Sequence, residues 1–185
     1  MSARTRAQEA DRAKLLAWID NDREANVAFL SRFVRAASPN PPGDTRDAAA
    51  VLISALDGAA LDVETIAPQE AMPNILATFE GRSEGRHLVL NGHIDVFPAK
   101  EASEGERDPF SGAVEDGCIY GRGVADMKCG TASLLLAFRY LHRLKDSLCG
   151  RLTYTAVSDE ETGGRWGTRY LMENHKDAVL GDCML

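Results

Sequence analysis

The chain has 185 residues, of which 44% are hydrophobic and 26% are charged, as is typical of a globular domain with a real core. Its 28 acidic and 21 basic residues give a formal net charge of −7, which disfavours a nucleic acid or an anionic membrane as partner. No apolar stretch approaches the ~18–20 residues of a membrane span. The charged N-terminus also lacks the apolar segment of a secretory signal, so we expect a cytoplasmic protein.

The first half of the chain predicts helices followed by strands. Apolar residues recur near helical spacing at the N-terminus, which indicates one long helix or two helices that meet at residues 20–22. The Pro- and Gly-rich segment 38–43 must end this pattern, and Asp44 or Thr45 then caps a helix that runs to Gly58. The expected elements are helices at 9–37 and 44–58 and strands at 61–66 and 74–79.

The second half alternates expected strands and helices, which favours an α/β fold. The expected elements are a strand at 86–91, a surface loop at 99–118, a helix at 131–144, a strand at 151–157, a helix at 165–174 and the start of a strand at 178–180. The strand at 86–91 leads to His93 and Asp95, and the strand at 151–157 leads to an acidic pair. Because functional sites of open α/β sheets gather at the carboxyl ends of strands, we expect these residues to share a site.

Three short clusters carry the side chains of a hydrolytic metal site. They are His93 with Asp95, the isolated Asp126, and the pair Glu160 and Glu161. Imidazole and carboxylate are the ligands of zinc sites that keep an open position, and a second carboxylate can act as general base. Each cluster alone has a commoner explanation as a structural histidine, a capping aspartate or a solvated turn, so the argument depends on their combination.

The residues around these clusters strengthen the hypothesis. They form a series of motifs: SPNPPG at 38–43, PNILA at 73–77, NGHIDV at 91–96, DPF at 108–110, YGRG at 120–123, DMK at 126–128 and DEETGG at 159–164. In this order and spacing they resemble the M20 metallopeptidase family, which includes acetylornithine deacetylase, succinyl-diaminopimelate desuccinylase, aminoacylase and glutamate carboxypeptidase. The resemblance covers nearly all of the chain after about residue 14.

The resemblance implies a role for each residue of the three clusters. His93 is expected to bind one metal, and Asp95 to orient its imidazole through the nitrogen that does not bind metal. Asp126 is expected to bridge two zinc ions, for which Co²⁺ or Mn²⁺ can substitute, and Glu161 to bind the second ion. Glu160 is expected to be the general base. The two glutamates can take different roles only if the chain bends there, which the glycines at 163–164 permit.

The resemblance also implies a fold and a reaction. The fold is a mixed sheet flanked by helices, as in the catalytic domain of zinc-dependent exopeptidases, with a cis peptide bond between Asp126 and Met127. The reaction is cleavage of the amide bond of a small-molecule N-acyl amino acid, as in a deacetylase or desuccinylase. The alternatives are a dipeptidase or carboxypeptidase acting on peptides, and a truncated, non-catalytic fragment. The complete protein is expected to be a homodimer.

Some parts of the family pattern have no counterpart in the sequence. Family members have a further acidic ligand after the Glu-Glu pair, usually in Gly-Glu-Pro, and a histidine ligand far downstream. Here the sequence ends with GDCML at 181–185, and Asp182 is not assigned to the metal. We therefore expect residues 1–185 to be the N-terminal portion of a catalytic domain without its lid or dimerisation domain. The isolated chain is expected to bind zinc weakly and to be inactive.

Overall fold

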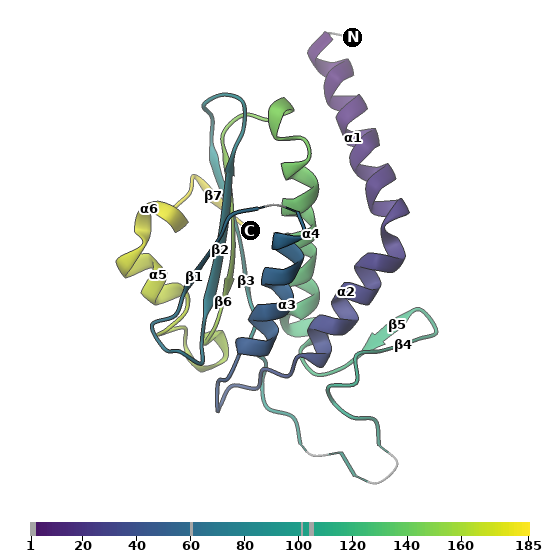
Figure 1. The fold of residues 1–185 in the computed structure, drawn as a ribbon, viewed down its shortest axis with the longest axis vertical. Coiled ribbons are helices and arrows are strands. Elements are labelled where there is room, and N and C mark those ends of the chain that lie inside the picture. Colours follow the sequence, from purple (N-terminus) through teal and green to yellow (C-terminus); the bar gives the residue numbers. More distant parts are fainter. Residues whose placement is uncertain (1–2, 60, 101, 104–105) are drawn as a thin grey trace.

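The computed structural model describes residues 3–59, 61–100, 102–103 and 106–185. A five-stranded sheet forms its centre, in the order β1-β2-β6-β3-β7 (Figure 1). The strands are β1 (Val63–Ile66), β2 (Asn74–Glu80), β3 (His87–His93), β6 (Arg151–Val157) and β7 (Cys183–Met184). The pairs β1–β2 and β2–β6 are antiparallel, whereas β3 is parallel to β6 and β7. The expected α/β fold with a mixed sheet is confirmed.

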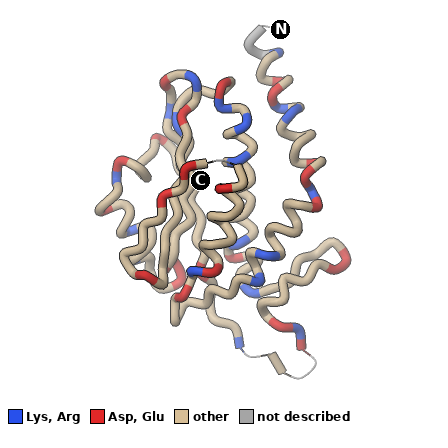
Figure 2. The backbone as a smooth tube through the Cα atoms, viewed as in Figure 1, with Lys and Arg blue, Asp and Glu red and all other residues tan. Residues whose placement is uncertain are grey.

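Helices cover both faces of this sheet. The helices of the described residues are α1 (Ala3–Asn21), α2 (Arg23–Arg35), α3 (Arg46–Asp57), α4 (Cys129–His142), α5 (Thr168–Asn174) and α6 (Lys176–Val179), with short helical turns η1 (Val124–Lys128), η2 (Lys145–Ser147) and η3 (Glu160–Thr162). Figure 1 shows α2, α3 and α4 on one side of the sheet and α5 and α6 on the other. Figure 2 shows both signs of charge along α1 and the loops. No helix in the described ranges is both long and apolar enough to cross a membrane.

The strands alternate their side chains between two hydrophobic clusters. In β2, Ile75 belongs to the large cluster under α2, α3 and α4, whereas Leu76 belongs to the smaller cluster under α5 and α6. In β6, Tyr154 belongs to the large cluster and Val157 to the smaller one, because side chains alternate between the two faces along a strand. Fully buried side chains such as Leu135 fix α4 to the sheet, and truncating such a residue to alanine costs about 2–5 kcal/mol.

Most expected elements of the chain are present with small shifts in their ends. Residues 9–37 form two helices that meet at Asp22, and β6 covers the residues expected at 151–157. Thr45 precedes α3, but its hydroxyl contacts Ala71 O and Ser158 Oγ rather than capping the helix. The helix expected from residue 165 begins at the start of α5, three residues later.

Two expectations were wrong. The segment 99–118, expected to be loop, contains the hairpin strand β4 (Ala113–Glu115) and the start of β5 (Cys118–Tyr120); residues 101 and 104–105 lie outside the described residues. The linking Asp116 and Gly117 both have positive φ, as the two-residue turns of hairpins require. The strand expected at 178–180 is instead the end of α6 followed by an extended residue. So short an apolar run is compatible with either a helix or a strand, because it is too short to show a periodicity.

Candidate metal centre

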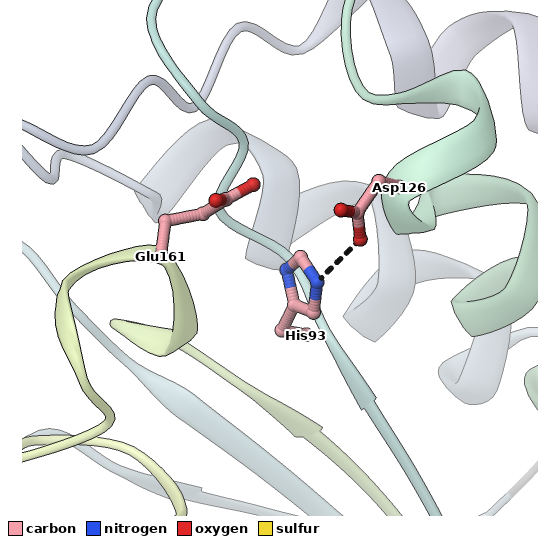
Figure 3. A group of neighbouring side chains, drawn as sticks. All are labelled: His93, Asp126 and Glu161. Atoms are coloured by element: carbon pink, nitrogen blue, oxygen red, sulfur yellow. Dashed lines mark hydrogen bonds and ion pairs between the residues drawn. The ribbon is translucent and has the colours of Figure 1, made fainter.

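The buried imidazole of His93 lies at the carboxyl end of β3 (Figure 3). Its Nδ1–H donates to the backbone oxygen of Asp95 at 2.8 Å, and the Asp95 carboxylate lies 3.4 Å from the same nitrogen. Its Nε2 lies 3.2 Å from Asp126 Oδ1 and 3.7 Å from Glu160 Oε2. The hydrogen bond at Nδ1 leaves Nε2 of the neutral ring as the nitrogen that can bind a metal.

The carboxylate of Asp95 is completely buried and holds the acidic turn. It accepts hydrogen bonds from Asn40 Nδ2 at 2.9 Å, Glu160 N at 3.2 Å and Glu161 N at 3.0 Å. Burial alone would raise the pKa of Asp95, but the hydrogen bonds from His93, Asn40 and the Glu161 amide outweigh it, so the pKa falls below its ordinary value. Asp95 is thus an ionised acceptor that connects the end of β3 to η3.

Asp126 reaches the same place from η1. Its side chain is 81% exposed, and its carboxylate contacts His93. The backbone enters η1 at Gly123 with a φ of 76°, and the expected cis peptide bond between Asp126 and Met127 is present. An added Cβ at Gly123 would lie 2.1 Å from a methyl carbon of Val96, so this entry has no room for a larger residue.

A buried lysine fixes η1 to the end of α2. Lys128 Nζ donates to the backbone oxygens of Phe33 at 2.9 Å and Ala36 at 2.5 Å, where the carbonyls of a helix end lack partners within the helix. Burial lowers the pKa of Lys128 to about 7. The position of Asp126 therefore depends on backbone and lysine contacts made by its neighbours.

The acidic pair lies in a tight turn after β6. Asp159 has a φ of 74° and Gly163 a φ of 103°, so η3 is bounded by two left-handed residues. The bend expected at the glycines is present, and the positive φ of Asp159 was not foreseen from the sequence. Glu161 Oε1 accepts a hydrogen bond from Phe97 N at 2.9 Å, and burial raises the pKa of Glu161. The Glu160 carboxylate lies near Nε2 of His93, the ring nitrogen that faces away from Asp95.

Three of these side chains form a group suited to a cation. His93, Asp126 and Glu161 each offer one ligand atom, and these atoms all lie within 4.8 Å of one another (Figure 3). One imidazole nitrogen and two carboxylates match the donor types of catalytic zinc sites. The structure therefore brings together the three residues expected to bind metal, with Asp95 behind His93, while their role as ligands stays a prediction.

The protonation of His93 reflects its acidic surroundings. Burial acts to lower its pKa, but hydrogen bonds to Asp95 and Asp126 raise it to about 9. A histidine that binds a metal does so as the neutral imidazole, so a cation held at Nε2 would displace a proton from this ring. The same excess of negative charge that holds this proton will attract a divalent cation.

An open cleft of about 600 Å³ gives access to this group. Asp126 and Glu161 line it together with Phe97, Arg122 and the segment between Gly121 and Ala125. A larger cavity of about 840 Å³ lies between α2, α3 and α4, and its lining includes none of the residues of the metal group. The smaller cleft is therefore the one that reaches the metal group, through Asp126 and Glu161.

Two residues of the site escaped the sequence reasoning. Asn40 and Asp159 are both buried beside the acidic turn, where Asn40 Nδ2 contacts Asp95, Asp159 and Thr162. Both residues occur in motifs that carry the family resemblance, but no spacing rule brings residue 40 next to residue 159. The structure supplies that contact.

A model of peptidase family M20/M25/M40 matches residues 89–184. An N-formyl-4-amino-5-aminomethyl-2-methylpyrimidine deformylase of Halalkalibacterium halodurans is 38% identical over 172 residues, which cover 90% of this chain and 40% of that protein. A succinyl-diaminopimelate desuccinylase of Nautilia profundicola is 42% identical over 97 residues, or 52% of this chain and 25% of that protein. The chain thus spans less than half the length of these curated relatives.

Solved structures share the fold. An M20 family metallo-carboxypeptidase of Sulfolobus solfataricus superposes with a TM-score of 0.73 at 22% identity, covering 86% of this chain and 36% of that one. Human carnosine dipeptidase 1 gives a TM-score of 0.69 at 24% identity, covering 89% of this chain and 38% of that one. At these identities the likeness concerns the arrangement of the backbone.

Proposed function

The chain belongs to peptidase family M20/M25/M40, and on this premise we propose that it forms part of a metal-dependent hydrolase that cleaves the amide bond of an N-acyl amino acid. The convergence of His93, Asp126 and Glu161, with ligand atoms within 4.8 Å of one another, carries the proposal. Residues 1–185 are then the N-terminal portion of the catalytic domain, and the complete enzyme is a homodimer.

The donor set fits divalent zinc. His93 Nε2 has a free lone pair in the neutral ring, and the carboxylates of Asp126 and Glu161 face the same space. In this assignment His93 would hold one ion and Glu161 the other, and the Asp126 carboxylate would serve both. When bound, divalent ions (zinc, or in its place Co²⁺ or Mn²⁺) would supply Lewis-acid chemistry for hydrolysis of an amide.

The remaining residues orient groups and move protons. Glu160 is the general base, because its Oε2 lies 3.7 Å from His93 Nε2, on the side where Asp126 also lies. Its carboxylate accepts a proton from the attacking water and passes it to the nitrogen of the leaving amine. Asp95 keeps Nδ1 of His93 as a donor and holds the turn that carries Glu160.

The substrate class rests on the curated relatives. Their printed names describe removal of a formyl group and of a succinyl group. Both names fit release of an acyl group from nitrogen, which supports an N-acyl compound over a dipeptide; the formylated compound is a pyrimidine, so the amino-acid part of the proposal rests on the desuccinylase alone. The cleft beside Asp126 is also lined by the exposed Arg122 and by Phe97, a cation and an apolar surface for a small acylated acid.

A substrate panel tests this function. The zinc-loaded chain and any longer product of the same gene are assayed with N-formyl, N-acetyl and N-succinyl amino acids and with matched dipeptides. We expect zinc binding by the chain, slow or no turnover by the chain alone, and faster turnover of N-acyl amino acids than of dipeptides by the longer protein. Faster cleavage of dipeptides would favour the peptidase alternative. A full-length, zinc-loaded protein that cleaves no amide would overturn the proposal.

A further inference from the structure

Asn40 occupies a fixed position beside the end of β3. Its backbone N–H donates to Val96 O at 2.9 Å, and Val96 N donates back to Ser38 O at 3.0 Å. The Ser38 hydroxyl donates to Ile94 O at 2.7 Å. The segment at 38–40 therefore runs alongside the residues that follow β3, and Asn40 is buried there, with 2% of the residue exposed.

The side-chain amide of Asn40 joins two parts of the site. Its Nδ2 lies 2.9 Å from Asp95 Oδ2, beyond β3, and 3.3 Å from Asp159 Oδ1, beyond β6. Thr162 Oγ1, at the end of η3, lies 3.1 Å from the same nitrogen. An amide nitrogen has two hydrogens, so one serves Asp95 at the shortest distance and the other is shared by Asp159 and Thr162.

The physical need for this amide arises from the two carboxylates. Asp95 is 0% exposed and Asp159 is 3% exposed, so both have lost water and depend on donors from the protein. The two carboxylates also repel each other where little solvent screens them. The Glu161 amide donates to Asp95 and the Trp166 amide to Asp159, whereas Asn40 donates to both.

The acidic turn is bound to β3 through the same carboxylate. Glu160 N and Glu161 N donate to Asp95 at 3.2 and 3.0 Å, and Asp95 in turn supports Nδ1 of His93. Loss of the Asn40 donor leaves Asp95 and Asp159 facing each other without the group that they share. The expected relaxation is movement of η3 away from β3, which changes the separation of Glu161 from His93.

We propose that Asn40 is a positioning residue: it clamps the acidic turn η3 against the end of β3 and thereby sets the spacing of the His93 and Glu161 ligands. The inference rests on the proposed function for its metal site and adds a residue to which no role had been given. In this role Asn40 acts through Asp95 and Asp159 and is neither a metal ligand nor a catalytic group.

Three variants test the clamp. Asn40→Ala removes the donor, and Asn40→Asp keeps the shape but places a third carboxylate against the other two. Asn26→Ala is the matched control, because Asn26, which lies in α2, likewise donates through its side-chain Nδ2, but to the hydroxyl of Tyr140 at 3.0 Å rather than to the acidic turn. The Asp variant is expected to be affected at least as strongly as the Ala variant, since it adds repulsion to the loss of the donor.

Hydrogen exchange of the metal-free chain is the first readout. Asn40→Ala should speed exchange at the amides of Glu160, Glu161 and Trp166 by about tenfold or more, because local opening frees them, while the amides of β3 and β6 keep their rates. Asn26→Ala should leave these three amides unchanged. Uniform acceleration across the sheet, or no acceleration at the turn, would overturn the clamp.

Zinc affinity, measured by titration calorimetry, is the second readout. Replacing a residue that orients a metal ligand typically lowers metal affinity by about 10–100-fold. Asn40→Ala should therefore weaken zinc binding by at least about tenfold, whereas Asn26→Ala should leave it unchanged. Unchanged zinc affinity in Asn40→Ala would contradict the positioning role even if the turn opens. A wild-type chain that binds no zinc would instead count against the proposed function, and the exchange readout would still decide the clamp.

Discussion

Two aspartates of the candidate site are held in opposite ways. Asp95 is 0% exposed and accepts hydrogen bonds from the Asn40 side chain and from the amides of Glu160 and Glu161. The side chain of Asp126 is 81% exposed, and its position depends on the backbone of η1 and on the buried Lys128. The first carboxylate is organised before a cation arrives, whereas the second remains open to one.

This contrast shows how the same residue type serves two purposes. A buried carboxylate saturated with donors stabilises the structure around it and has little capacity left for a metal. An exposed carboxylate beside a histidine keeps its lone pairs available at little cost to the fold. The predictions below test whether the two halves of the site differ in this way.

Glu160→Gln should give the largest effect, which falls on catalysis alone. The amide cannot accept the proton from water, and loss of a general base typically lowers turnover by about 10²–10⁴-fold. Zinc affinity should remain near the wild-type value, because the ligand atoms of the metal group belong to His93, Asp126 and Glu161. Steady-state assays on a catalytically active, full-length protein, with calorimetry alongside, measure both quantities. Near-normal turnover would remove Glu160 from the mechanism.

Replacing each aspartate in turn separates the two halves. Asp95→Ala should lower the free energy of unfolding of the metal-free chain by about 3–5 kcal/mol, because it leaves buried donors and His93 without their partner. Asp126→Ala should change it by no more than about 0.5 kcal/mol, as expected for an exposed side chain. Both should weaken zinc binding. Urea unfolding measures the stabilities, and equal losses in the two variants would contradict the comparison.

The pH dependence of stability tests the electrostatics at His93. Its pKa is raised from 6.5 to about 9 in the fold, so its contribution is fully present below about pH 6.5 and is lost as pH rises through 9. The metal-free chain should therefore lose up to about 3 kcal/mol from this residue across that window. Unfolding from pH 6 to 9.5 measures the slope, and His93→Gln should flatten it. An identical slope in the variant would contradict the assignment.

Lys128→Met should destabilise the chain less than Asp95→Ala, and its effect falls on the Asp126 half of the site. The substitution leaves the carbonyls of Phe33 and Ala36 without their donor, although it also removes the cost of burying an amine. The loss of the donor is the larger of the two, so the free energy of unfolding should fall by about 1–2 kcal/mol. Zinc affinity should fall as η1 loosens. Lys14→Met is the control, because Lys14 is exposed and pairs with Asp11 on the same helix. Thermal unfolding of both variants, with zinc titration, distinguishes loss of the anchor from loss of a charge.

Local signals in the sequence predicted the parts of the site that lie next to regular elements. The apolar runs of β3 and β6 placed His93 and the Glu160–Glu161 pair at strand ends, because strand length and direction follow from pattern. The hairpin around Asp116 also has a local signal, because Asp-Gly favours such turns, although the segment was expected to be a loop. The contact of Asn40 with Asp159 joins residues 119 positions apart, and no local pattern specifies that proximity.

A crystal structure of the chain grown with zinc tests the central claim most directly. The account predicts an anomalous zinc peak about 2.0–2.2 Å from Nε2 of His93 and from a carboxylate oxygen of Asp126, with Glu161 placed to hold a second ion beside Asp126. Nδ1 of His93 should still donate to Asp95, and Asp95 should remain unligated and buried. Zinc bound elsewhere with these three side chains left free, or zinc bound by Asp95 in place of Asp126, would contradict it.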